Sequence, residues 1–266
     1  MLLIAIILST LAAGIGSVWV AALLMRAGLG SREGGVGQQH LLSLAAGALL
    51  ATAFMHLLPE AFESQAGAHE LFATLLVGLV FFFLLDKAEL WHHGHEHSHA
   101  GHDHAHHHGH AHSDTPRTGG WTVLTGDSVH CFGDGVLIAS AFLADMRLGL
   151  IAAVSVLAHE VPHHMGDLVV LRQSSASRRI ALVKVSLAGA VTALGGVVGY
   201  FLVGQLQDSL PYFLAVASSS FIYVALADLI PQLQKRLSAR QTVAQIIWLL
   251  LGMGVVMLVS GAAHAH

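Results

Sequence analysis

Charged residues are scarce in this chain. Only 11% of its 266 residues are Asp, Glu, Lys or Arg, whereas 55% are hydrophobic and the mean hydropathy is +0.67. Soluble domains usually carry about 25% charged residues. A water-soluble fold of this size cannot bury so much apolar surface, so the composition excludes an ordinary soluble domain and indicates a protein of the lipid bilayer.

Basic residues and cysteine are also few. The chain has 12 Lys and Arg against 16 Asp and Glu, which gives a formal net charge of −4 with His neutral. Proteins that bind nucleic acid need a basic surface, so we expect no nucleic-acid partner. The single cysteine, Cys131, excludes an intramolecular disulfide framework. The residue in excess is histidine, with 21 copies.

Apolar stretches long enough to cross a bilayer recur along the whole chain. A spanning helix needs roughly 20 predominantly apolar residues. We therefore predict an all-α polytopic membrane protein with one transmembrane domain over residues 1–266. Its eight predicted spans are 2–25, 39–59, 70–90, 121–143, 148–171, 180–204, 210–231 and 242–262. The first span has no Lys or Arg before its apolar run, and that run is too long for a signal peptide, so we expect a retained helix.

Basic residues are distributed unequally between the two sides of this topology. The odd-numbered loops and their flanks contain 11 of the 12 Lys and Arg residues, and the even-numbered loops contain Arg147 alone. Cytoplasmic loops are enriched in Lys and Arg. The odd-numbered loops are therefore predicted to be cytoplasmic and both termini to lie outside, in a multi-pass protein of an inner or plasma membrane.

A histidine-rich segment separates the third and fourth predicted spans. It reads WHHGHEHSHAGHDHAHHHGHAH over 91–112 and has no apolar periodicity, so we predict a flexible cytoplasmic loop over 91–120. Clustered imidazoles bind borderline metals such as Zn²⁺, which favours metal sequestration or sensing over a simple solvated linker. The loop residues predicted to bind metal are His92, His93, His95, His97, His99, His102, His104, His106, His107, His108, His110 and His112.

Two short motifs at the ends of predicted spans resemble each other. AFMHLLPE (53–60) ends the second span and ALADLIPQ (225–232) ends the seventh, with a polar residue, two aliphatic residues and proline in matched places. In the predicted topology these two helices cross the membrane in opposite directions. Inverted pairs of this kind are typical of transporters, although eight matched positions also allow a chance match.

Ionisable side chains concentrate in the fourth and fifth predicted spans, which contain DSVHCFGDG (127–135) and HEVPHHMGD (159–167). Such residues are costly within a membrane helix and usually functional. His130 lies ~14 Å and His159 ~17 Å into helices that enter from opposite sides, at ~1.5 Å per residue. Both polar turns are therefore expected near the middle of the membrane.

Residue spacing places these ligand types on common helix faces. His130 and Asp134 are four residues apart, as are His159 and His163. Two histidine nitrogens from one helix with a histidine and an aspartate from the other make a tetrahedral set suited to Zn²⁺, and further donors could hold a second ion. Pro162 bends its helix, as is tolerated where a helix lines a cavity. Interhelical hydrogen bonding is the alternative for each histidine alone. The predicted metal ligands are His130, Cys131, Asp134, His159, Glu160 and His163.

Other polar residues mark a candidate route to and from this site. A group at the outer end of the second span could capture a cation, although an ordinary interfacial helix terminus is the alternative. Asp167 lies two turns inward of His159 and could pass an ion to the cytoplasm. The predicted pathway residues are His56, Glu60, Glu63, Asp127, His164 and Asp167.

These motifs resemble those of the ZIP family of zinc and iron transporters. HEVPHHMGD is similar to HExPHExGD of one ZIP subgroup, HLLPEAFES (56–64) is similar to a stretch of the same subgroup, and HCFGDG resembles HNxxDG or HNxPEG. The resemblance covers nearly the whole chain. It implies a 3+2+3 inverted-repeat bundle, a binuclear metal site between the fourth and fifth helices, sliding or rocking of two bundles during transport, and a homodimer.

The resemblance also implies a distribution of ligands. One metal would be held by His130, Asp134 and His163, with His159 nearby. The second would involve Cys131, Asp134, Glu160 and His163. Two features depart from the family pattern: Cys131 replaces the usual Asn and favours Zn²⁺ or Cd²⁺ over Mn²⁺, and His164 replaces a Glu. In some members a carboxylate on the sixth helix completes the second site, and the sixth span here has none within 183–196.

The sequence therefore predicts a transporter that takes up divalent transition metals, with Zn²⁺ as the main substrate and Cd²⁺, Fe²⁺ or Mn²⁺ as further candidates, and no enzymatic activity. HEVPH also fits the H-E-x-x-H motif of an intramembrane zinc metalloprotease with Glu160 as general base. Pro162 inside the motif and the surplus turn at His130 weigh against a protease. A proton-coupled metal exporter, a channel, and a metal buffer anchored by its helices are also compatible with these motifs.

Overall fold

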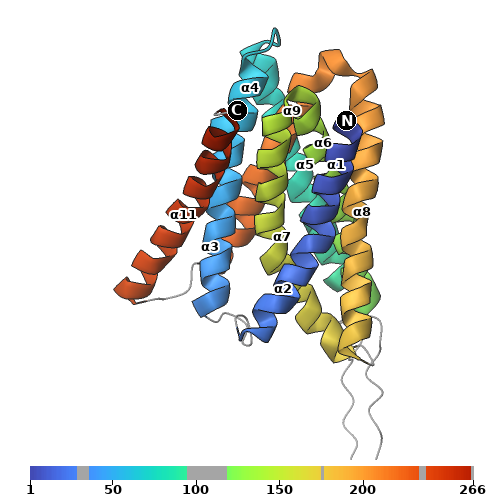
Figure 1. The fold of residues 1–266 in the computed structure, drawn as a ribbon, viewed down its shortest axis with the longest axis vertical. Coiled ribbons are helices and arrows are strands. Elements are labelled where there is room, and N and C mark those ends of the chain that lie inside the picture. Colours follow the sequence, from blue (N-terminus) through green and yellow to red (C-terminus); the bar gives the residue numbers. More distant parts are fainter. Residues whose placement is uncertain (29–35, 95–118, 175–176, 234–237, 265–266) are drawn as a thin grey trace, which may run out of the picture.

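A computed structural model describes residues 1–28, 36–94, 119–174, 177–233 and 238–264 (Figure 1). In these residues every regular element is a helix, and consecutive helical segments join into eight long rods. The first three rods are α1 (Leu2–Leu11), η1 (Ala12–Gly16) and α2 (Ser17–Arg26); α3 (Val36–Thr52), η2 (Ala53–Leu57) and α4 (Leu58–Phe62); and α5 (Ala68–Gly94). The middle pair is α6 (Gly119–Ala144) and α7 (Met146–Ser174). The last three are α8 (Arg178–Gln205); η4 (Gln207–Ser209), α9 (Leu210–Tyr223), η5 (Val224–Leu229) and α10 (Ile230–Leu233); and α11 (Ala239–His264).

Each apolar stretch of the sequence coincides with one rod, and the rods extend slightly beyond the predicted ends. Six helices in the described residues are long and apolar enough to span a membrane. They are Leu2–Arg26, Gly37–Phe62, Ala68–Leu85, Arg178–Gln205, Gln207–Ala227 and Ala239–Val259. The rods α6 and α7 are not among these six, and they are the rods that contain the two polar motifs. The protein is thus an all-helical membrane protein with two polar helices inside an apolar bundle.

Most of the histidine-rich segment lies outside the described residues. The flanking helices extend into the range 91–120 that was predicted as a loop: α5 continues to Gly94 and α6 begins at Gly119. The terminal turns of a helix need no apolar periodicity, so the apolar pattern of the sequence did not predict these helix ends. His92 and His93 fall in the last turn of α5, and the loop histidines from His95 to His112 lie outside the described ranges.

The rods run antiparallel, so both chain ends lie at the same end of the bundle, together with α4 (Figure 1). The polar rods α6 and α7 pack against each other; α6 also packs on α8 and α9, and α7 on α2 and α3. Outside this centre, α3 packs on α11 and α5 on α9. The outer rods expose many large apolar side chains, including Phe72 of α5 and Leu250 of α11. Lipid rather than water suits such a surface.

Within the described residues, three segments widen from α-helix to π-helix. Two of them, η2 and η5, coincide with the two similar motifs of the sequence, and each is followed closely by proline, Pro59 and Pro231 respectively. The motif similarity is therefore matched by a shared backbone irregularity. Isolated π-helical turns occur frequently at functional sites. The third, η1, immediately precedes Ser17.

The first rod approaches α8 at backbone contact. A Cβ atom at Gly14 of η1 would clash with the backbone carbonyl of Gly189 and with the Thr192 side chain. Only glycine allows this approach, because any larger side chain would push the helices apart. The contact holds η1 close to α8, and α2, which follows directly, packs beside α7.

Candidate metal centre

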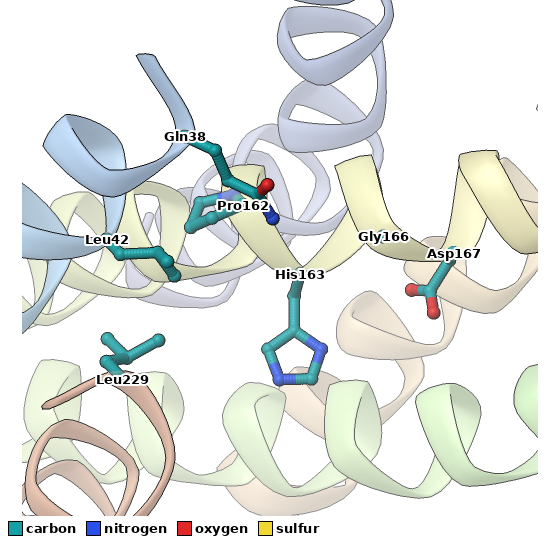
Figure 2. Close-up of a pocket in the computed structure, with 7 residues that line it drawn as sticks. All are labelled: Gln38, Leu42, Pro162, His163, Gly166, Asp167 and Leu229. Atoms are coloured by element: carbon teal, nitrogen blue, oxygen red, sulfur yellow. The ribbon is translucent and has the colours of Figure 1, made fainter. Parts of the chain in front are cut away.

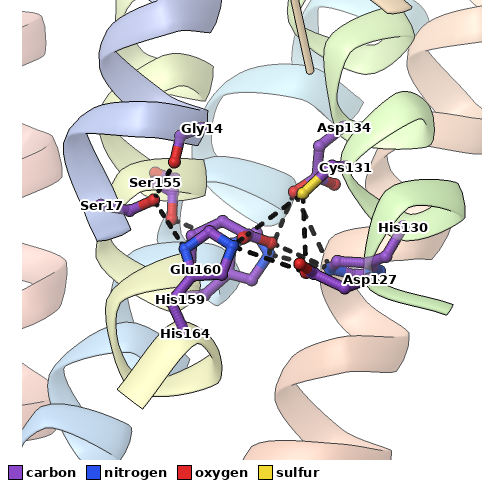
Figure 3. Close-up of polar contacts among 10 residues, drawn as sticks. All are labelled: Gly14, Ser17, Asp127, His130, Cys131, Asp134, Ser155, His159, Glu160 and His164. Carbon is purple, nitrogen blue, oxygen red and sulfur yellow. Dashed lines mark hydrogen bonds and ion pairs between the residues drawn. The ribbon is translucent and has the colours of Figure 1, made fainter. Parts of the chain in front are cut away.

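The facing turns of α6 and α7 form a first cluster of four metal-ligating side chains. These are His130, Asp134, His159 and Glu160, and one ligand atom of each lies within 4.8 Å of all the others (Figure 3). The Nε2 atom of His159 is 3.2 Å from Asp134 Oδ2, and that of His130 is 3.3 Å from Glu160 Oε1. The two Nε2 atoms are 3.4 Å apart. Two imidazoles and two carboxylates thus converge on one point, in a set that suits Zn²⁺.

A second cluster adjoins the first. It consists of Asp127, Cys131, Glu160 and His164, again with ligand atoms within 4.8 Å of one another. His164 Nε2 is 3.0 Å from Glu160 Oε2 and 3.5 Å from Asp127 Oδ1. The Cys131 Sγ atom is 3.7 Å from Asp127 Oδ1 and 3.8 Å from Glu160 Oε2. Glu160 therefore directs one carboxylate oxygen into each cluster.

The second cluster is buried throughout, and in the first cluster only His130 is partly exposed, with 26% of its side chain accessible. Glu160 and His159 are each 1% exposed, and Cys131 and His164 are fully buried. Four inward-facing atoms, Asp127 Oδ2, Asp134 Oδ2, Glu160 Oε1 and His164 Nε2, lack a hydrogen bond of standard geometry in the described residues, although three of them lie 3.0 to 3.3 Å from a neighbouring ligand atom. Burying three carboxylates with so few hydrogen bonds is costly, whereas a divalent cation between them would neutralise and coordinate them. The donor sets thus fit one ion in each cluster.

Hydrogen bonds outside the clusters orient the imidazoles. His159 Nδ1 lies 3.2 Å from the backbone carbonyl oxygen of Ser155, which can only accept a hydrogen bond. His159 Nδ1 therefore carries the proton, and the Nε2 lone pair points into the first cluster. The Ser155 hydroxyl also pairs with the hydroxyl of Thr52 on α3, so this support continues into a neighbouring rod.

The structure brings together five of the six predicted ligands and adds two predicted pathway residues. His130, Cys131, Asp134, His159 and Glu160 all belong to the clusters. Asp127 and His164, assigned to the pathway from the sequence, also belong to them.

The exception is His163. It is outside both clusters, although the family resemblance places it in both. Its ring stacks on that of His130 with centroids 5.3 Å apart and planes 17° apart. Glu160 and, four residues later, His164 direct ligand atoms into the second cluster, whereas His163 contacts α6 through this ring stacking.

His163 lines a cavity of about 220 Å³ between α7, the beginning of α3 and the end of η5 (Figure 2). The lining residues are Gln38, Leu42, Pro162, His163, Gly166, Asp167 and Leu229. Asp167 Oδ2 is buried without a hydrogen-bond partner in the described residues. Because α3 begins at the end of the bundle opposite the chain termini (Figure 1), the cavity lies on that side of the clusters.

The predicted outer group lies near the end of the bundle that holds the termini. His56 is half-buried in η2, whereas Glu60 and Glu63 are exposed. Glu60 is close enough to Glu63 and to Asp145, between α6 and α7, to interact with both electrostatically. Sequence analysis missed Asp145, although it is the acidic residue of a very short connection. These residues form an acidic surface apart from the clusters.

Sequence analysis also missed Ser17, which contacts His164 from α2 at 2.9 Å. A serine in an apolar first span is a weak signal, because serine is common in membrane helices.

The geometry of the two histidines argues against the intramembrane protease. H-E-x-x-H needs both histidines on one ion, but His159 lies in the first cluster and His163 lines the cavity.

Comparison with known proteins agrees with the motifs. The family model described as ZIP zinc transporter matches residues 1–260. The zinc transporter foi of Drosophila melanogaster is 35% identical over 141 residues, covering 53% of this chain and 20% of the relative. Human zinc transporter ZIP4 is 38% identical over 115 residues, covering 43% and 18%. Zinc transporter ZIP13 of Pongo abelii is 27% identical over 275 residues, covering 96% and 77%.

The aligned part of this chain spans about a fifth of the length of the first two relatives and about three quarters of the third. The family model, in contrast, extends over almost all of this chain, including both polar rods. The protein therefore belongs to the ZIP zinc transporter family.

Proposed function

We propose that this protein moves divalent transition metals, zinc foremost, across an inner or plasma membrane into the cytoplasm, through two adjoining metal positions between α6 and α7. The observation that carries the proposal is the buried Glu160 carboxylate, which joins two four-residue clusters inside an apolar bundle. The three relatives described above are each named as zinc transporters, which supports zinc as the substrate. Transport gives a role to both clusters, whereas the H-E-x-x-H protease chemistry would need only one metal ion.

All eight rods cross the membrane in this proposal. The rods α6 and α7 can do so despite their polar residues because apolar rods surround their polar faces. Both termini lie at one end of the bundle (Figure 1), and 11 of the 12 basic residues belong to the connections and flanks of the opposite end. The positive-inside rule then places the termini outside and the cavity lined by His163 on the cytoplasmic side.

We also propose a 3+2+3 inverted repeat, in which the first three rods correspond to the last three and α6 corresponds to α7. The packing pairs support it: α3 packs on α11 as α9 packs on α5, and α7 packs on α3 as α6 packs on α9. The matched π-helical segments η2 and η5 fall on corresponding rods. Inverted repeats place the substrate site at the repeat interface, where the two clusters lie. A homodimer remains a prediction from family resemblance, which the mass of the purified complex would test.

The proposed route begins at the acidic outer surface and ends at the cavity. A cation is attracted by Glu60, Glu63 and Asp145, loses water as it enters the clusters, and leaves past His163 and Asp167. An inside-negative potential favours this direction by ~2.3 kcal/mol per charge per 100 mV, and thus by about twice that for a divalent ion.

Reconstitution into liposomes tests this function. Zn²⁺ added outside, with a zinc-sensitive dye inside and an inside-negative potential, should give a saturable signal. That signal should be absent for Glu160→Gln and retained for Asp208→Asn, which removes an exposed carboxylate remote from the clusters. Equal signals for empty and protein-containing liposomes would refute transport, and a signal only under the reversed gradient would indicate export.

A further inference from the structure

The second cluster has a polar neighbour on a rod that supplies none of its four ligands. The Ser17 hydroxyl of α2 lies 2.9 Å from His164 Nδ1 and 2.6 Å from the backbone carbonyl oxygen of Gly14 (Figure 3). Ser17 and His164 are both fully buried. A buried hydrogen bond thus connects the first rod to an imidazole that belongs to the candidate metal centre.

The two contacts of Ser17 determine which atom donates. A hydroxyl has one hydrogen and the Gly14 carbonyl oxygen can only accept, so Ser17 donates to Gly14 and offers a lone pair to His164. His164 Nδ1 must then carry the imidazole proton. This leaves His164 Nε2 with its lone pair directed at Glu160 Oε2 and Asp127 Oδ1. Three electron-rich atoms in such proximity suit a cation among them.

The position of Ser17 depends on the π-helical segment that precedes it and on the contact of that segment with α8. The π-helical segment η1 ends at Gly16, directly before Ser17, and Gly14 within it lies against the Gly189 backbone of α8 without space for a side chain. Thr192 of α8 borders this junction and also hydrogen-bonds Cys131, another residue of the second cluster. The junction of the first rod with α8 therefore touches two members of the second cluster.

We propose that Ser17 is a positioning residue for the second metal position: it holds His164 with Nδ1 protonated and Nε2 available to the metal. The inference rests on the proposed function, since it assumes that this cluster binds metal. Groups that orient a metal-ligating histidine typically contribute 10- to 100-fold in metal affinity or activity. Removal of the Ser17 hydroxyl should therefore weaken metal binding at the second position by about that factor.

The single cysteine provides a selective measurement. Cys131 is the only thiol in the chain, so the ultraviolet charge-transfer absorption of a Cd²⁺–thiolate bond reports the second position and not the first. The full-length protein, purified in detergent, is titrated with Cd²⁺ alone. Ser218→Ala is the matched control, because Ser218 is also fully buried and its hydroxyl donates to a carbonyl of its own helix, Leu214, at 2.8 Å.

We expect Ser17→Ala to shift the Cd²⁺ titration to roughly 10- to 100-fold higher concentration. Ser218→Ala should stay within about twofold of wild type. Ser17→Thr and Ser17→Val have nearly equal volume, and the threonine variant should bind the more tightly because it keeps the hydroxyl. Comparison of the threonine and valine variants therefore shows whether the hydroxyl supports metal binding, even if Ser17→Ala folds poorly.

A double-mutant cycle separates positioning from general stability. If Ser17 acts through His164, Ser17→Ala should add less than about twofold in a His164→Ala background. The inference fails if Ser17→Ala binds Cd²⁺ like wild type, if the threonine and valine variants are equal, or if the effects of the two substitutions multiply.

Failure of the inference and failure of the proposed function give different results. A wild-type protein that accumulates Zn²⁺ in liposomes but shows no cadmium–thiolate band would overturn the second position, and Ser17 with it, while transport stands. A wild-type band that depends on Ser17, without any Zn²⁺ movement, would leave the positioning role intact and refute transport.

Discussion

The two clusters of the metal centre share a carboxylate but are built differently. The first draws all its ligands from α6 and α7, and its His159 is held by a carbonyl oxygen four residues earlier in the same helix. The second also draws its ligands from these two rods, but its imidazole is held by Ser17 of the first rod, and its thiol also interacts with Thr192 of α8.

The difference shows what each position depends on. In the first cluster the ligands and the carbonyl that orients His159 all come from α6 and α7, and Thr52 of α3 pairs with the Ser155 hydroxyl behind them. The second additionally requires the first rod and α8 to be in place, so relative movement of these rods would disturb it more. Variants should therefore separate the two positions.

The largest effect is expected at Glu160, where the clusters meet. Glu160→Gln keeps the shape of the side chain but removes the charge from both positions, so Zn²⁺ uptake should fall more than about 100-fold, beyond the 10- to 100-fold typical of groups that only orient a ligand. Uptake into liposomes and the number of bound Cd²⁺ ions measure this. Retention of either bound ion would show that Glu160 does not bridge the clusters.

A smaller and more selective effect is expected at Asp134, which belongs to the first cluster alone. Asp134→Asn should reduce Zn²⁺ uptake roughly 10- to 100-fold. The cadmium–thiolate band should remain, because Cys131 and its cluster keep their four side chains. Loss of the band together with uptake would mean that the clusters form one inseparable site.

Replacing Cys131 should change the metal preference of the protein. Serine in its place replaces a soft sulfur ligand by oxygen, so Cd²⁺ should compete about tenfold less effectively with Zn²⁺ uptake. Cys131→Ala serves as the comparison that removes the ligand altogether. Unchanged competition by Cd²⁺ in the serine variant would place the transported ion away from the thiol.

Acidification should lower uptake moderately. The histidines bind metal only through a neutral nitrogen, so protons compete with the metal as pH falls through the imidazole range, from about 7.5 to about 5.5. Initial rates of Zn²⁺ uptake at fixed membrane potential measure the effect. A rate that rises steadily over this range would contradict the ligand scheme or reveal coupling to protons.

The smallest effect is expected from deleting residues 95–112, which leaves α5 and α6 whole. If the helices carry the transport function, uptake should stay within about twofold of wild type, because chain between helices often tolerates shortening. Accumulation of bound zinc by the histidine-rich segment would be lost. Abolished uptake would favour the interpretation in which the helices only anchor a metal buffer.

Much of the architecture was predictable because membrane helices have a simple chemical requirement. A stretch such as 180–204 must satisfy its backbone internally and face lipid, and this determines both its length and its composition. The same logic identified the polar turns at His130 and His159 as exceptional. The π-helical segments were not predictable, since a widened turn does not alter the apolar character of the sequence.

The sequence was a poorer guide to which residues form each cluster. Spacing of three or four residues allowed both His163 and His164 to face α6, and family resemblance favoured His163. The structure directs His164 into the second cluster and leaves His163 at the cavity. The choice depends on how α7 is rotated against α6 and α2, which is a property of packing rather than of the spacing of residues along one helix.

The amino-acid sequence by itself determined that this protein is a helical membrane protein and which residue types gather near its centre, because hydrophobicity and charge act locally along the chain. Only the tertiary structure decided which nitrogen and oxygen atoms converge, that Glu160 joins two clusters, and that Ser17 supports one of them. Those relations involve atoms from rods far apart in sequence, and their distances depend on helix rotation and close packing, which no single segment encodes.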